Sequence, residues 1–118
     1  MKRNHRGLLV WQTSVELVED IYRVTATFPK SEIYGLASQM QRAAVSVPSN
    51  IAEGSARSGT KELLHFLSIA SGSQSELDTQ LEIAHKLGYL KDPSGLQKKI
   101  DDVFSLLVGL NTSLKRKT

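Results

Sequence analysis

The chain has 118 residues, of which 40% are hydrophobic and 23% charged, proportions typical of one soluble globular domain. It contains no cysteine, which excludes disulfides, thiolate zinc sites and cysteine nucleophiles. Its formal net charge of +3 permits an acidic partner but does not require one.

The first helical pattern follows a basic N-terminal segment. Apolar residues recur at spacings of three and four in two neighbouring rows, which predicts a helix over about 8–27 that packs against more than one neighbour. Phe28-Pro29 ends it, because the residue before a proline disfavours the helical conformation. Acidic residues from Glu16 onward interrupt the apolar residues too early for a signal peptide or a membrane span. We therefore expect a cytoplasmic protein with no membrane association.

A proline stands inside the second helical pattern, which covers about 32–57 after a possible N-cap at Ser31. A proline in a helix removes one backbone hydrogen bond, and its ring collides with the carbonyl four residues back, here that of Ala44. The apolar repeat nevertheless continues through Pro48 to Ile51. A kinked helix packed within a bundle accounts for both observations.

The third helical pattern covers about 60–88, with Thr60 suited to the N-cap and Gly88 to the position after the C-terminus. Small residues leave this helix nearly bare for more than one turn, so another helix can approach closely. That helix belongs either to the same bundle or to a neighbouring protomer. The small residues are Ser71, Gly72, Ser73 and Ser75.

The fourth pattern covers about 94–115, and Ser94 and Gln97 have the spacing of a capping box at its start. No strand-like alternation of useful length occurs anywhere in the sequence. Short connections between long helices favour antiparallel neighbours. The sequence therefore predicts one all-α domain over 1–118, an antiparallel up-down-up-down four-helix bundle with a proline-kinked second helix.

One end of such a bundle collects basic residues, because the starts of helices one and three meet the ends of helices two and four. Eight basic residues stand there against Glu53 and Glu62, an excess of six positive charges in a chain with a net charge of +3. The eight are Lys2, Arg3, Arg6, Arg57, Lys61, Lys115, Arg116 and Lys117.

Two interpretations of this basic end remain open. Phosphate backbones bind to such a concentration of charge, whereas basic termini can also serve only to keep a protein soluble. No aromatic residue is interleaved with the basic residues in the sequence. We therefore expect neither base stacking nor sequence-specific recognition.

A second group of polar residues is predicted inside the bundle. Glu76 and Gln80 belong to a helical row with apolar ends, which indicates partial burial, and a buried carboxylate needs a partner. Arg42 is the candidate for a bidentate ion pair with Glu76. Asn50 is placed to bond a carbonyl freed by Pro48. Together with Glu53, these residues form the predicted structural network, for which a catalytic carboxylate is the alternative.

The sequence gives no sign of catalytic or metal chemistry. The three histidines, His5, His65 and His85, lack the spacing of metal ligands on a helix. Neither a nucleophile elbow nor a phosphate-binding loop is present. We therefore expect no catalytic residue, no metal and no cofactor, and a protein that is not an enzyme.

Several strings occur in an order typical of one known family, and they span nearly the whole chain. Among them are Val10-Trp11-Gln12, Phe28-Pro29, Tyr34-Gly35-Leu36, Arg42-Ala-Ala-Val-Ser-Val-Pro-Ser-Asn-Ile-Ala-Glu-Gly54, Glu76-Leu-Asp-Thr-Gln80 and Leu87-Gly-Tyr-Leu90. The chain resembles the four-helix-bundle family of the 23S ribosomal RNA intervening-sequence proteins.

The resemblance implies a ring-shaped homopentamer of four-helix bundles, for which no biochemical activity is generally assigned. A related protein, the accessory protein of diversity-generating retroelements, works with a reverse transcriptase and nucleic acid through a basic surface. We therefore expect a non-enzymatic, self-assembling accessory or scaffold protein that engages RNA or DNA with its basic end. The alternative is a protein–protein interaction module that binds no nucleic acid.

Overall fold

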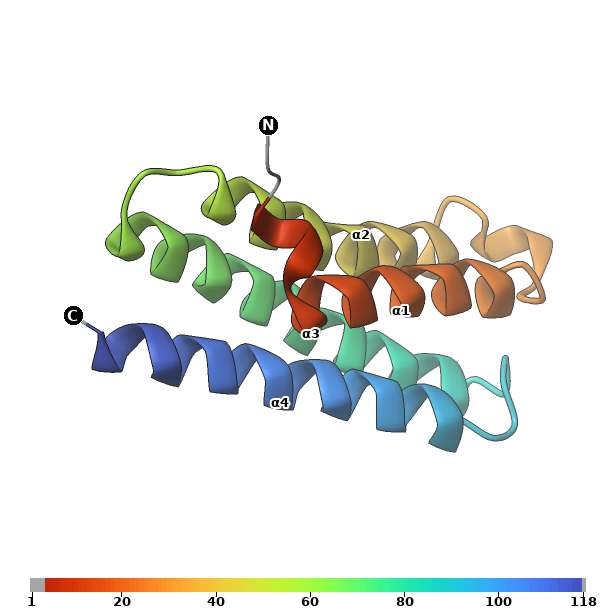
Figure 1. Ribbon diagram of the computed structural model, residues 1–118. Helices are drawn as coiled ribbons and strands as arrows, with labels where there is room; N and C mark the ends of the chain where they lie inside the picture. Colours follow the sequence, from red (N-terminus) through yellow and green to blue (C-terminus); the bar gives the residue numbers. More distant parts are fainter. Residues whose placement is uncertain (1–3, 118) are drawn as a thin grey trace.

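The computed structural model describes residues 4–117, which fold into four long α-helices and two short 3₁₀ helices, with no strand in that range. Successive long helices run in opposite directions along the longest dimension of the molecule (Figure 1), which measures 46 × 25 × 19 Å. The elements are η1 (Asn4–Gly7), α1 (Leu9–Thr25), η2 (Lys30–Glu32), α2 (Leu36–Ser55), α3 (Thr60–Lys86) and α4 (Ser94–Arg116). The predicted all-α bundle is confirmed.

All four long helices contribute to one hydrophobic core. Ile21 of α1, Met40 of α2, Leu77 of α3 and Ile100 of α4 are each 0% exposed. Burying one such side chain contributes about 1.5–3 kcal/mol to stability relative to leaving it in water. Each helix turns one apolar stripe inward because its buried residues recur at spacings of three and four, as the sequence pattern predicts.

The N-terminal helix η1 is held against α1 by the Trp-Gln pair at the start of that helix. The Arg6 guanidinium lies 5.3 Å from the Trp11 ring, and the His5 ring meets the same indole edge-on at 5.1 Å. The Gln12 side chain donates a hydrogen bond of 2.8 Å to the Arg6 carbonyl. The string Val10-Trp11-Gln12 therefore fixes the position of a basic residue, Arg6, near the start of the bundle.

The connection between α1 and α2 differs from the sequence prediction. The second helix begins at Leu36 rather than near residue 32, and Ser31 does not cap it because residues 30–32 form η2 instead. Glu32 takes the capping role, since its carboxylate accepts hydrogen bonds from the Leu36 N–H at 3.0 Å and the Tyr89 hydroxyl at 2.7 Å. These two bonds hold the pKa of the Glu32 carboxyl below its usual value.

Pro48 lies within α2 and is buried, with helical residues on both sides of it. The Asn50 side chain donates at 2.8 Å to the carbonyl of Ser46, not to that of Ala44, which faces the missing N–H. That part of the prediction is wrong because a helical asparagine reaches the carbonyl four residues before itself. The kink at Pro48 stays a prediction.

Of the two predicted ends of α3, one is confirmed and the other is wrong. Gly88 has a φ of +80°, its N–H bonds the His85 carbonyl, and the next N–H bonds that of Ala84, both at 3.0 Å. This is the Schellman arrangement that a C-terminal glycine favours, so that prediction is confirmed. The predicted cap at Thr60 is wrong, because Gly59 occupies the N-cap position and no side chain caps α3.

The predicted capping box at the start of α4 is also wrong. Pro93 occupies the N-cap position, and the Ser94 N–H bonds the Asp92 carboxylate at 3.0 Å. The Gln97 side chain turns away from the helix start and donates to Asp78 of α3 at 2.8 Å and to Asp101 at 3.0 Å. Gln97 therefore joins α3 to α4 instead of capping α4.

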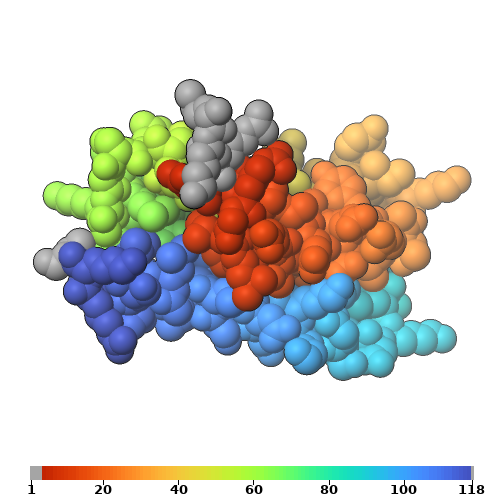
Figure 2. Space-filling view, viewed as in Figure 1, coloured from red at the N-terminus to blue at the C-terminus, as the bar shows by residue number. Residues whose placement is uncertain are grey.

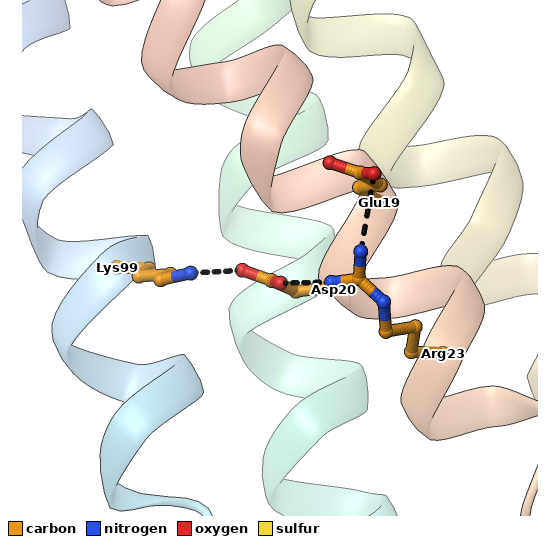
Figure 3. Close-up of polar contacts among 4 residues, drawn as sticks. All are labelled: Glu19, Asp20, Arg23 and Lys99. Carbon is orange, nitrogen blue, oxygen red and sulfur yellow. Dashed lines mark hydrogen bonds and ion pairs between the residues drawn. The ribbon is translucent and has the colours of Figure 1, made fainter.

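A chain of charged side chains links the first and last long helices (Figure 3). Lys99 of α4 bonds Asp20 of α1, and Arg23 bonds Asp20 at 3.2 Å and Glu19 at 3.1 Å. Asp20 is the least exposed of the four, with 20% of its side chain accessible. It therefore carries the ionic contact between α1 and α4.

Candidate nucleic-acid interface

Two of the predicted basic segments lie at the same end of the molecule. The connection from α2 to α3, with Arg57 and Lys61, and the C-terminal end of α4 both lie at the left in Figure 1. Figure 2 shows the surface of this end from the same side. The predicted residues of α4, Lys115, Arg116 and Lys117, are exposed there.

The N-terminal part of the predicted site lies further back. Helix η1, which carries Arg6, sits against α1 and α2 away from that end (Figure 1). Helix α1 is too short to reach that end, because it has 17 residues whereas α3 has 27. Lys2 and Arg3 lie outside the described residues. The described part of the basic end therefore consists of the α2–α3 corner and the end of α4.

A close approach of two helices shapes the α2–α3 corner. Gly54 is buried in the last turn of α2, and a Cβ atom there would lie 2.8 Å from the Phe66 Cβ and 2.9 Å from the Leu63 Cδ1. Only glycine fits without a shift of α3. The glycine that ends the proline-centred motif therefore places Phe66 beside the last residues of α2.

Arg57 lies across this corner and contacts Phe66. Its guanidinium carbon is 5.2 Å from the centre of the Phe66 ring, a cation–π distance. Its Nη2 atom also lies 3.2 Å from the Glu53 carboxylate, one turn earlier in the chain. Both side chains of this ion pair are about half exposed, so the pair contributes less than about 1 kcal/mol. Arg57 can therefore exchange Glu53 for another anion at little cost.

A pocket of about 360 Å³ opens at this corner, lined by Arg57, Lys61, Glu62, His65 and Phe66. The fold brings aromatic residues to the basic end, although none is interleaved with the basic residues in the sequence. Phe66 and His65 stand beside the two cations, and their rings meet edge-on at 5.4 Å. The sequence analysis missed Phe66 because the fold, and not sequence adjacency, sets it beside Arg57. The spacing Lys-x-x-x-His-Phe at 61–66 could have indicated that these side chains lie on the same side of one helix.

The predicted polar network is not joined as expected. The prediction of an Arg42–Glu76 ion pair is wrong. Arg42 forms no ion pair within residues 4–117, and Glu76 is exposed. Arg42 instead lines a pocket between α1 and α2 with Tyr22 and Val45. Gln80 is buried, and its Nε2 atom lies 3.5 Å from the Glu76 carboxylate. The predicted members therefore make separate contacts and not one network.

The described part of the chain holds no group of three or more His, Asp or Glu side chains placed to bind a metal ion. No helix in residues 4–117 combines the length and the hydrophobicity needed to cross a bilayer. The fold and the charged corner thus define a small helical-bundle protein with cations gathered at one end.

Comparison with known families makes the assignment specific. Residues 6–109 match the 23S rRNA-intervening sequence protein family, and the chain belongs to that family. The match covers all of α1, α2 and α3 and most of α4. No curated protein matches the sequence significantly.

Proposed function

We propose that this protein is a non-enzymatic accessory or scaffold protein of the cytoplasm that self-assembles and binds nucleic acid through its basic end. One observation carries the proposal. Cations from two chain segments far apart in sequence, Arg57 and Lys61 on one side and Arg116 and Lys117 on the other, are exposed at the same end of the bundle. A phosphate backbone can contact both segments at once.

The binding would be electrostatic. Each phosphate that meets a lysine or arginine releases condensed counterions, so the affinity falls with salt by about 0.7–0.9 logarithmic units per contact and per tenfold rise in salt. Such contacts position the nucleic acid without reading its sequence. Assembly would strengthen the effect, because every protomer adds another copy of the basic end.

Self-assembly is supported by apolar side chains left exposed on the long helices, and the expected homopentamer follows from the family resemblance. Tyr22 of α1 and Val45 of α2 line one pocket at 48% and 39% exposure, and Ile69 and Ile83 of α3 are 40% and 42% exposed. Partly exposed apolar surface of this kind often marks a contact between chains. In the part of the chain that the structure describes, no atom lies within 4 Å of the position of a Cβ on Gly72, so a neighbouring chain has room to approach α3 there.

Light scattering after size exclusion tests the assembly. A mass about five times the 13.0 kDa of one chain is expected. A mass equal to one chain would remove both the ring and the repetition of the basic end.

Salt titration of nucleic-acid binding tests the interface. In the variant Arg116→Gln/Lys117→Gln, the slope of log affinity against log salt should fall by about 1.4–1.8 if each residue meets one phosphate. The matched control is Lys30→Gln/Lys91→Gln, which removes two exposed lysines from the connections at the opposite end. The control should retain the native slope. An equal fall in both variants would place the binding elsewhere.

The rival function, a protein–protein interaction module, also has one supporting observation. At the end opposite the cations, Tyr34 is 97% exposed, Leu87 55% and Ile33 54%. Apolar side chains this open favour a partner protein. A failure of the wild-type protein to bind RNA or DNA even at low salt would favour this function over the first.

A further inference from the structure

We propose that the pocket at the α2–α3 corner accepts an unpaired nucleobase, so that the basic end prefers single-stranded over double-stranded nucleic acid. The inference rests on the proposed function and specifies its ligand. It follows from the aromatic residue that the fold brings to the basic end, since cations alone give no reason to prefer single strands.

The pocket offers aromatic and guanidinium groups on which a base can stack. The Arg57 guanidinium lies 5.2 Å from the Phe66 ring centre, and the His65 ring meets Phe66 edge-on at 5.4 Å. Bases stack on phenylalanine and histidine rings and on the planes of arginine guanidinium groups. At about 360 Å³, the pocket lies in the lower part of the range found for small-ligand sites.

The charges around the pocket suit the phosphate attached to that base. Lys61 lies four residues before His65, on the same side of α3, and both line the pocket. Glu62 lines it too and repels phosphate, which directs the backbone toward Lys61 and Arg57. The Glu53 carboxylate holds Arg57 at 3.2 Å in an exposed pair that a phosphate can displace.

A duplex cannot use the pocket in this way. The faces of its bases are covered by their neighbours in the stack, so a duplex presents only phosphates to Arg57 and Lys61. A single strand presents the same phosphates and can also turn a base outward onto an aromatic side chain. Single-strand affinity should therefore depend on Phe66, whereas duplex affinity should not.

The test uses Phe66→Leu in the full chain. Leucine keeps an apolar side chain against Gly54 but removes the ring. The matched control is Phe104→Leu, which removes a half-buried phenylalanine of α4 that does not line the pocket. Circular dichroism checks that both variants keep their helices. Phe66→Tyr, which restores a ring, serves as the rescue.

The probe is a labelled single-stranded oligonucleotide without self-complementarity, compared with the duplex that it forms with its complement, as RNA and as DNA. Phe66→Leu should weaken single-strand binding roughly tenfold, leave duplex binding and the salt slope unchanged, and be rescued by Phe66→Tyr. Equal effects of Phe66→Leu and Phe104→Leu, or equal losses for strand and duplex, would overturn the inference while the proposed function stood. An absence of all nucleic-acid binding would overturn both.

Discussion

Replacing Gly54 by alanine tests whether the close approach of α2 and α3 shapes the basic corner. The new Cβ would lie 2.8 Å from the Phe66 Cβ, an atom bonded directly to the backbone of α3. Neither atom can move without shifting a helix. Overpacking of this kind costs about 1–3 kcal/mol. Alanine's higher helix propensity offsets up to about 1 kcal/mol of that cost, and less so in the last turn of α2.

The matched control is Gly109→Ala in α4, where no atom of residues 4–117 lies within 4 Å of the new Cβ. There only the gain in helix propensity remains, about 0.5–1 kcal/mol of added stability. The two glycine-to-alanine changes should therefore act in opposite directions and differ by about 2 kcal/mol. For a domain of this size, each kcal/mol shifts the Tm by about 4 °C.

Urea unfolding followed by far-ultraviolet circular dichroism measures both variants at one protein concentration, because assembly also affects stability. Gly54→Ala should unfold at lower urea than the wild type, and Gly109→Ala at higher urea. If Gly54→Ala proved as stabilising as Gly109→Ala, α3 would not lie close to α2 at this corner. The contact between Arg57 and Phe66 would then lose its structural basis.

Two further predictions concern the ends of the helices and the bundle's ionic contacts. Asp20→Asn should lower the free energy of unfolding by about 0.5–1 kcal/mol, and a double-mutant cycle with Lys99→Met should show that most of this comes from the α1–α4 contact. Tyr89→Phe should lower stability at neutral pH, whereas Tyr34→Phe, at a residue 97% exposed, should not. The pKa of Glu32 is lowered in the folded state. The ionised Glu32 carboxylate therefore stabilises the fold above the usual glutamate pKa, and this stabilisation is lost as the pH falls through the lowered pKa of the folded state. The loss of stability on acidification should therefore be smaller in Tyr89→Phe, as urea midpoints across that pH range would show; an unchanged acid dependence would contradict the Tyr89–Glu32 bond.

The architecture follows from the sequence because periodicity reports which face of a helix is buried. Of the two apolar rows predicted for α1, one is buried at Val10, Ser14, Leu17 and Ile21. In the other row Val15 and Tyr22 are 40% and 48% exposed. Gly88 was likewise predictable, since its positive φ is a local requirement that glycine meets best. Both properties depend on a few residues close together in the chain.

The caps and the polar contacts could not be predicted, because they depend on groups distant in sequence. Ser31 had the right chemistry for a cap, but the bond from Tyr89, 57 residues away, helps hold Glu32 at the start of α2 instead. The Arg42–Glu76 pair failed for a similar reason: sequence spacing gives the face of a helix but not the neighbour that this face meets. Arg42 faces α1 rather than α3.

The candidate site likewise has one part that the sequence predicts and one part that it does not. The gathering of Arg57, Lys61 and the residues at the end of α4 follows from helix count and direction, which sequence patterns give well. The pocket follows from Gly54, whose missing side chain lets two helices meet. Only the fold shows that this contact places Phe66 beneath a guanidinium.

The central claim is that nucleic acid binds where the α2–α3 corner meets the end of α4. Backbone amide chemical shifts, recorded by NMR during titration with a single-stranded oligonucleotide, test it most directly. We expect the changes to concentrate at residues 54–66 and 113–117. Changes confined to the opposite connections, 26–36 and 87–93, or no change in any amide at low salt, would contradict the account.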